Sequence, residues 1–189
     1  MFENLNLFLE YIDKSIFFLI NNFNNPFMDH LMFLISDKYI WIPLYIILIY
    51  YILNQKNKFK YLQLSLIILA VILSDFITSS IMKPFFERLR PCHDNEINGS
   101  INLVGICRGM YGFASSHAST TFSLATIMYL FFKKNKIFIY LFIWSILISY
   151  SRIYLGVHYP LDVLAGSGIG TIVSVSIFKF QKFYFKKNV

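Results

Sequence analysis

Two histidines in the sequence lie beside residues that could direct their chemistry. Ser115 and Ser116 immediately precede His117, and Asp162 follows His158 by four residues. Because the pKa of histidine is close to neutral, its ring can donate a proton or, when a carboxylate fixes its tautomer, attack as a nucleophile. We therefore interpret His158 as a nucleophile that Asp162 orients, and His117 as a general acid.

Cationic side chains recur close to these histidines along the chain. Guanidinium groups bind phosphate oxygens through paired, charge-assisted hydrogen bonds, and backbone N–H groups at a helix N-terminus also bind anions. The serines before His117 are expected to cap such a helix. Arg88, taken alone, is interpreted as a residue that attracts lipid headgroups. We predict that five residues bind a phosphoryl group: Lys83, Arg90, Ser115, Ser116 and Arg152.

Long apolar runs indicate that membrane helices position these residues. The 189-residue chain is 57% hydrophobic and only 14% charged, whereas a soluble domain carries about 25% charged residues. A membrane helix needs about 20 mostly apolar residues. Five runs are candidates: residues 41–53, 61–82, 119–132, 137–150 and 161–178. The predicted fold is an all-α, polytopic membrane bundle of about five spans.

The distribution of lysines predicts the orientation of this bundle. Three segments carry ten lysines and no acidic residue: Lys56, Lys58, Lys60, Lys133, Lys134, Lys136, Lys179, Lys182, Lys186 and Lys187. By the positive-inside rule these segments are cytoplasmic, so the net charge of +7 indicates no nucleic-acid partner. We expect a multi-pass protein of the cytoplasmic (inner) membrane, with its C-terminus inside and its site facing the periplasm or exterior.

The remaining segments complete a single predicted membrane domain, residues 1–189. Residues 1–37 are expected to form outer interfacial helices, with an amphipathic helix at 4–22. Residues 83–116 form an outer loop, and residues 117–180 form the catalytic helices. Small residues in the last span, Gly166, Gly168 and Gly170, are expected to allow close helix packing.

The outer loop contains both cysteines of the chain, Cys92 and Cys107. An oxidising compartment permits them to form a disulfide, which is the pairing we expect. The alternative is a zinc site that adds His93 and Asp94. Adjacent residues 92 and 93 do not match the usual spacing of zinc ligands, so the disulfide is favoured.

Three motifs together resemble the type 2 phosphatidic acid phosphatase and vanadium haloperoxidase superfamily. They are Lys83-x6-Arg90-Pro91, Ser115-Ser116-His117 and Ser151-Arg152-x5-His158-x3-Asp162. The resemblance implies a phosphohistidine at His158, Asp162 as its orienting carboxylate, and His117 as proton donor. It also implies that no metal or other cofactor is needed.

The chain departs from this family pattern at two positions and in its number of spans. Ala114 and Ser116 replace the usual proline and glycine of the middle motif, which affects the geometry of the phosphate loop. Family members often have six spans, and the first of these is not among the five counted above.

Among the activities of this family, we expect dephosphorylation of undecaprenyl diphosphate. The alternatives are phosphatidylglycerophosphate, phosphatidate and lipid A phosphates. The alternatives from other functional classes are a vanadate-dependent peroxidase and a non-catalytic anion transporter. Related haloperoxidases are soluble, and anion transport does not explain why His158 follows Arg152 and precedes Asp162. The sequence predicts no oligomeric state.

Overall fold

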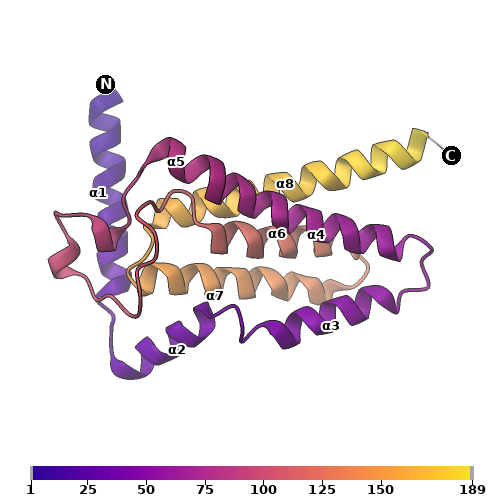
Figure 1. Cartoon of the computed structure of the whole chain (residues 1–189), viewed down its shortest axis with the longest axis horizontal. Helices are drawn as coiled ribbons and strands as arrows, with labels where there is room; N and C mark the ends of the chain where they lie inside the picture. Colours follow the sequence, from indigo (N-terminus) through magenta and orange to yellow (C-terminus); the bar gives the residue numbers. More distant parts are fainter. Residues whose placement is uncertain (1, 188–189) are drawn as a thin grey trace.

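The structure is a computed structural model that describes residues 2–187, with side chains described for residues 7–184. In that part of the chain every regular element is a helix (Figure 1). The α-helices are α1 (Phe2–Asn21), α2 (Pro26–Ser36), α3 (Ile42–Leu53), α4 (Lys60–Phe76), α5 (Lys83–Phe86), α6 (Ser116–Phe131), α7 (Tyr140–Tyr154) and α8 (Pro160–Lys187). The predicted all-α fold is confirmed.

Each of the five predicted apolar runs coincides with a helix of the bundle. A π-helical segment, Ile77–Met82, joins α4 to α5, so that one continuous helix covers Lys60–Phe86. This helix, Lys136–Tyr154 and Pro160–Tyr184 are long and apolar enough to cross a membrane. α3 has 12 residues and α6 has 16, so both are shorter. The total of five spans stays a prediction.

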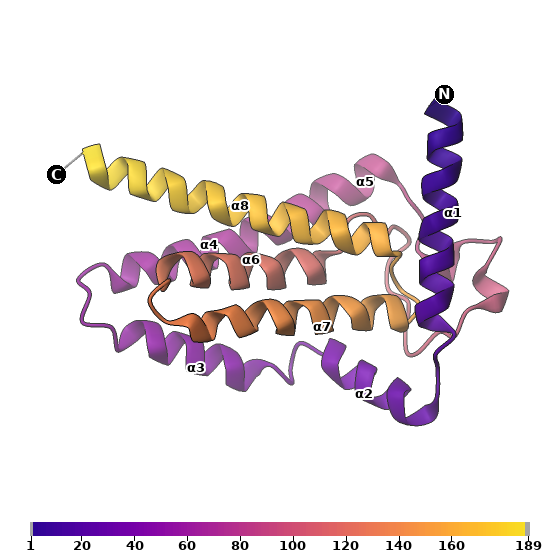
Figure 2. The ribbon, with the colours of Figure 1, turned by 180° about the vertical axis from the view of Figure 1, so that it is seen from behind.

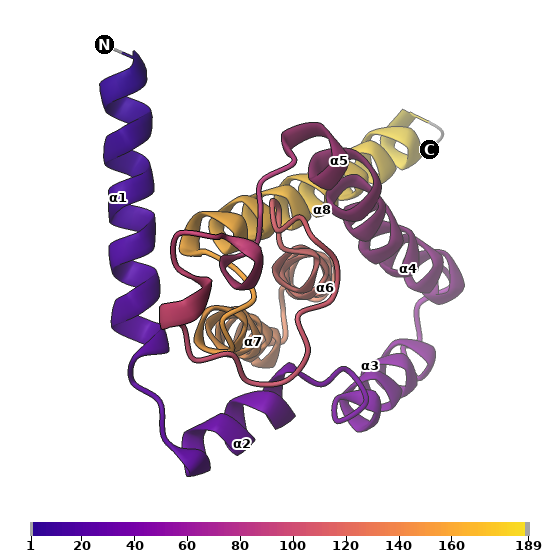
Figure 3. The same ribbon diagram turned by 60° about the vertical axis from the view of Figure 1, so that its left-hand side comes forward.

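α6 occupies the centre of the bundle, with α4, α7 and α8 around it (Figure 3). Its buried side chains include Ala125 and Met128, which belong to the same apolar cluster as Ile67 of α4 and Trp144 of α7. This packing places the first turn of α6, which contains His117, among the ends of the neighbouring helices.

Two glycines of α8 allow its backbone to lie directly against α6. A Cβ atom at Gly166 would collide with the backbone carbonyl of Ser115, and one at Gly170 with the carbonyl of Ser119. Gly168 has open space around its Cα atom. Residues four apart share a helix face, which explains why Gly166 and Gly170 are the pair that packs.

The two ends of the bundle differ in composition (Figures 1 and 2). The lysine-rich α3–α4 and α6–α7 connections lie at one end with the last turns of α8, and the 83–116 loop lies at the other. α1 crosses the loop end at a steep angle to the bundle.

α1 contacts the rest of the protein along a single face. Asp13, Phe17 and Asn21 are spaced four apart and are at most 1% exposed, whereas Phe8 and Leu19 are exposed. Asn21 donates to the carbonyl oxygens of Asn102 and Tyr154 at 2.8 and 2.7 Å and accepts from the N–H of Asn102 at 2.8 Å. These bonds join α1 to the outer loop and to the end of α7.

Candidate active site

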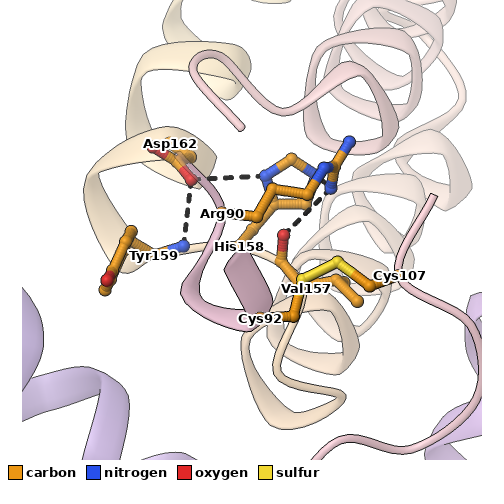
Figure 4. Close-up of a disulfide and its surroundings, with 7 residues drawn as sticks. All are labelled: Arg90, Cys92, Cys107, Val157, His158, Tyr159 and Asp162. Atoms are coloured by element: carbon orange, nitrogen blue, oxygen red, sulfur yellow. Dashed lines mark hydrogen bonds and ion pairs between the residues drawn. A yellow bond between two sulfur atoms is a disulfide. The ribbon is translucent and has the colours of Figure 1, made fainter. Parts of the chain in front are cut away.

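His158 lies in the short connection between α7 and α8, where its ring is 1% exposed. Gly156, with φ of +77°, provides the left-handed residue that ends α7 and turns the chain towards His158. The ring contacts different residues at its two nitrogens (Figure 4). Nδ1 is 3.3 Å from Oδ2 of Asp162, and Nε2 is 2.9 Å from a guanidinium nitrogen of Arg90.

These contacts specify the tautomer of His158. An ionised carboxylate can only accept a hydrogen bond, and a guanidinium can only donate one. The proton therefore belongs on Nδ1 and the lone pair on Nε2. Burial, followed by the charges of Arg90, Arg152 and Lys83, holds the pKa of His158 well below its ordinary value. The arrangement gives a neutral imidazole whose Nε2 can act as a nucleophile.

Asp162 lies at the start of α8 and is completely buried. Besides His158, it accepts the backbone N–H of Tyr159 at 3.0 Å on Oδ2 and a guanidinium N–H of Arg88 at 2.8 Å on Oδ1. Gly112 packs against this carboxylate, because a Cβ atom there would lie 2.8 Å from Oδ2. Gly112 was not predicted as a site residue, since one glycine among several in a loop carries no distinctive signal.

The interpretation of Arg88 as a headgroup-attracting cation is wrong. Its guanidinium is paired inside the protein with Asp162 and, at 2.5 Å, with Oδ2 of Asp13. It also lies over the ring of Tyr159, 4.5 Å from the centroid. Single residues in a sequence do not show their tertiary partners, and here one partner is 75 residues away.

Asp13 was also missed, because it lies in a helix that the sequence assigned only to the membrane interface. Its second carboxylate oxygen accepts the backbone N–H of Leu161 at 2.8 Å, in the first turn of α8. Burial raises the pKa of Asp13, and the hydrogen bonds from Arg88 and Leu161 oppose this shift.

The predicted cations act on both histidines, and Arg90 contacts Nε2 of His158 directly. The charges of Lys83, Arg90 and Arg152 all act on His158 and on His117. Arg90 also donates to the carbonyl of Val157 at 2.9 Å, and Arg152 donates to the hydroxyl of Ser36. Three cations from three segments therefore surround the two histidines, as the motif spacing predicts.

Several buried polar atoms in this group have no hydrogen-bond partner within the protein. Six such side-chain atoms occur among the described residues, and three belong to predicted phosphate ligands: Nε of Arg90, Nε of Arg152 and Oγ of Ser115. Leaving a buried polar group unpaired costs about 1–3 kcal/mol. Two cationic donors and a hydroxyl from the motif residues therefore have hydrogen-bonding capacity that an anion would satisfy.

The two serines at the start of α6 have different roles. Ser115 occupies the N-cap position, but its hydroxyl makes no capping bond. The hydroxyl of Ser116 lies 2.9 Å from Nζ of Lys83 and 2.8 Å from the hydroxyl of Ser79, so it contacts the π-helical segment. Any contact of Ser116 with phosphate is therefore expected from its backbone N–H.

The outer loop is closed by a disulfide between Cys92 and Cys107, whose Cα atoms are 6.4 Å apart (Figure 4). His93 lies close to both sulfur atoms. Since these sulfurs are bonded to each other, neither is a thiolate that could bind zinc. The disulfide lies two residues after Arg90 and steadies the segment that carries it.

An apolar groove of about 450 Å³ lies below the site, between α3, α4 and α6. We call it the tail groove, and its lining includes Leu48, Ile52, Leu64, Ile67, Val71 and Leu124. Thr121 also lines it, and its hydroxyl donates to the carbonyl of His117 at 2.8 Å. The groove thus begins about one helical turn below His117.

Comparisons with known proteins agree on the family. A family model described as the PAP2 superfamily matches residues 63–186. The lipid A 4'-phosphatase of Bacteroides thetaiotaomicron is 34% identical over 166 residues, covering 86% of this chain and 74% of the relative. The undecaprenyl-diphosphatase of Sulfolobus acidocaldarius is 30% identical over 163 residues, covering 85% and 74%.

A solved structure extends this similarity to three dimensions. The crystal structure of Aquifex aeolicus LpxE superimposes with a TM-score of 0.69 and 31% sequence identity. The match covers 87% of this chain and 93% of that structure. The family match at residues 63–186 includes both His117 and His158.

Proposed function

The chain belongs to the PAP2 superfamily and is a membrane lipid phosphatase, and on that premise we propose that lipid A is its substrate. From the sequence alone, undecaprenyl diphosphate was the expected substrate and lipid A phosphates were an alternative. The comparisons favour that alternative, because the lipid A 4'-phosphatase relative is the more similar of the two.

The observation that carries the proposed chemistry is the group of buried, unpartnered donors that belong to the same motifs as the two histidines. Arg90, Arg152 and Ser115 each present a buried polar atom without a partner. A phosphate ester has oxygen atoms for these donors and a phosphorus atom for the lone pair of Nε2. Donors fixed in place before the reaction stabilise the charge that develops on phosphoryl oxygens.

The proposed reaction has two steps. Nε2 of His158 attacks phosphorus, the P–O bond to the lipid breaks, and His117 gives its proton to the leaving oxygen. Water then attacks the phosphohistidine, gives a proton to His117, and the P–N bond breaks to release phosphate. Asp162 stabilises the positive charge of the phosphorylated ring throughout, as carboxylates do for catalytic histidines.

We place an acyl chain of the substrate in the tail groove. The groove is lined mainly by aliphatic side chains and reaches Thr121, whose hydroxyl bonds to the backbone of His117. A lipid whose phosphate lies at His158 could therefore extend a chain into it. The site lies at the opposite end from the lysine-rich connections, which supports an outward-facing reaction.

The test is phosphate release by detergent-purified protein from lipid A, undecaprenyl diphosphate, phosphatidylglycerophosphate and phosphatidate, each with EDTA. We expect lipid A to have the highest kcat/KM, and His158→Ala to lose at least about 10⁴-fold. His30→Ala, at an exposed histidine on α2, is the matched control. Faster turnover of another lipid would reject the substrate, and an active His158→Ala protein would reject the mechanism.

A further inference from the structure

Behind His158, two buried carboxylates share one guanidinium. One terminal nitrogen of Arg88 donates to Asp162 at 2.8 Å and the other to Asp13 at 2.5 Å. The side chains of both aspartates are 0% exposed, whereas Arg88 is 27% exposed. A continuous chain of polar contacts therefore runs from Asp13 through Arg88 and Asp162 to Nδ1 of His158.

Asp13 also holds the helix that carries Asp162. Its Oδ1 accepts the N–H of Leu161 at 2.8 Å, and N–H groups in the first turn of a helix have no partner within that helix. An acidic side chain from α1 therefore caps α8 and interacts favourably with the positive end of its dipole. α1 is thus joined to Asp162 both through Arg88 and through the backbone.

The charges on the two sides of the imidazole are opposite. Two carboxylates and one guanidinium on the Nδ1 side leave one net negative charge when both are ionised. Without Asp13, Arg88 would balance Asp162 alone and the net charge there would be zero. Because the ring becomes positive when Nε2 is phosphorylated, the negative charge favours formation of that intermediate.

We propose that Asp13 is a positioning residue for phosphoryl transfer, acting through Arg88 on Asp162 and His158. This inference rests on the proposed phosphohistidine reaction. It gives α1 a function in addition to lying at the membrane surface: the helix completes the active site from a segment that contains none of the three motifs.

The deciding variant is Asp13→Asn. Asparagine can still accept the N–H of Leu161, but it has no charge with which to hold Arg88. At metal sites, loss of an outer partner of a ligand reduces affinity or activity about 10- to 100-fold, and we take this range as the guide for Asp13. We expect a loss of that size in kcat and in the single-turnover rate of phosphohistidine formation, with KM changed less than about twofold.

The matched control is Lys14→Gln on the same helix. Lys14 pairs with Glu10, Asp94 and Glu96 and does not contact Arg88. This variant loosens α1 from the outer loop but leaves the Asp13–Arg88 pair, so its kcat should stay close to that of the wild type. Equal losses in both variants would show only general docking of α1 and would overturn the proposal.

A double-mutant cycle tests whether Asp13 acts through Arg88. In an Arg88→Met background, Asp13→Asn should cause little further loss of kcat, because residues in one network are not additive. Full additivity, wild-type kcat in Asp13→Asn, or a loss confined to KM would each overturn the proposal. If Asp13→Asn does not fold, Arg88→Gln separates Asp13 from Asp162 while Asp13 still caps α8. Because this variant leaves the Nδ1 side more negative, a loss of kcat would show that the network acts by positioning Asp162, and unchanged kcat would overturn the proposal.

Failure of the proposed function can be distinguished from failure of this inference. If wild-type protein forms no phosphohistidine, the underlying reaction is rejected whatever Asp13 does. If the wild type forms it and Asp13→Asn forms it equally fast, only the role of Asp13 is rejected.

Discussion

The two sides of the His158 ring, which we call its Nε2 face and its Nδ1 face, differ in how far the sequence predicts the residues around them. On the Nε2 face, Arg90 contacts the ring, and the charge of Arg152 also acts on it. Both arginines belong to recognisable motifs, and their chemistry suits a phosphate. On the Nδ1 face, Asp162 is a motif residue, but Arg88 and Asp13 are identified only by their contacts. The chemistry of a ligand limits which residue types can bind it, so such residues can be recognised in a sequence. The residues that support them are determined by tertiary packing, which a sequence does not display.

The largest effect expected from this comparison is at Arg90. Arg90→Gln removes a charged donor from the phosphate face, and loss of one such donor costs about 10²- to 10³-fold in kcat. The exposed Arg108, in the same loop, provides the control Arg108→Gln, which should retain nearly full activity. A loss for Arg90→Gln no larger than for Asp13→Asn would remove the distinction between the two faces.

The pH dependence of kcat/KM should distinguish the two faces by the direction in which variants shift its acid limb. The pKa of His158 is held well below its ordinary value by burial and by Arg90, Arg152 and Lys83. Since the reactive ring is neutral, activity should persist below about pH 6.5 and decline only as pH falls through the lowered pKa.

Variants on opposite faces should move this acid limb in opposite directions. Arg90→Gln removes a positive charge and should raise the pKa of His158, which moves the limb to higher pH. Asp13→Asn removes a negative charge and should move it to lower pH. Profiles measured with a soluble phosphate ester would test this, and shifts of the same sign would contradict the assignment of charges.

The smallest effect is expected from a substitution in the tail groove, away from both faces of His158. Val71→Phe should fill part of the tail groove and raise KM about tenfold for a long-chain lipid, roughly the value of one or two buried methylene groups. A water-soluble phosphate ester should be hydrolysed as before. Ile46→Phe, on the exposed side of α3, is the control, and equal effects on both substrates would place the groove outside substrate binding.

Much of the fold was predictable, because apolar runs determine which segments form helices in a bilayer. The motif spacing predicted that Lys83, Arg90, Arg152 and His117 would lie near His158, and the structure places them together. Their phosphate-binding and catalytic roles stay proposals until the variants are measured.

Other features depend on tertiary contacts that the sequence does not display. Asp13 has an ordinary position in an amphipathic helix, and its importance comes from burial against Leu161 and Arg88. The tail groove is formed by aliphatic side chains from separate helices, which are indistinguishable in sequence from any other apolar residues in a membrane span. The sequence could not distinguish the proposed lipid A from undecaprenyl diphosphate for the same reason, since the three motifs contain only residues that would contact phosphate.

The glycine contacts between α6 and α8 limit which helices can move when a lipid binds. Because Gly166 and Gly170 place the α8 backbone against the carbonyls of Ser115 and Ser119, these helices cannot slide past each other without collision. We expect His117 and His158 to travel as one rigid body. Any opening that admits a bulky lipid must therefore come from α3 and α4, which line the tail groove together with α6.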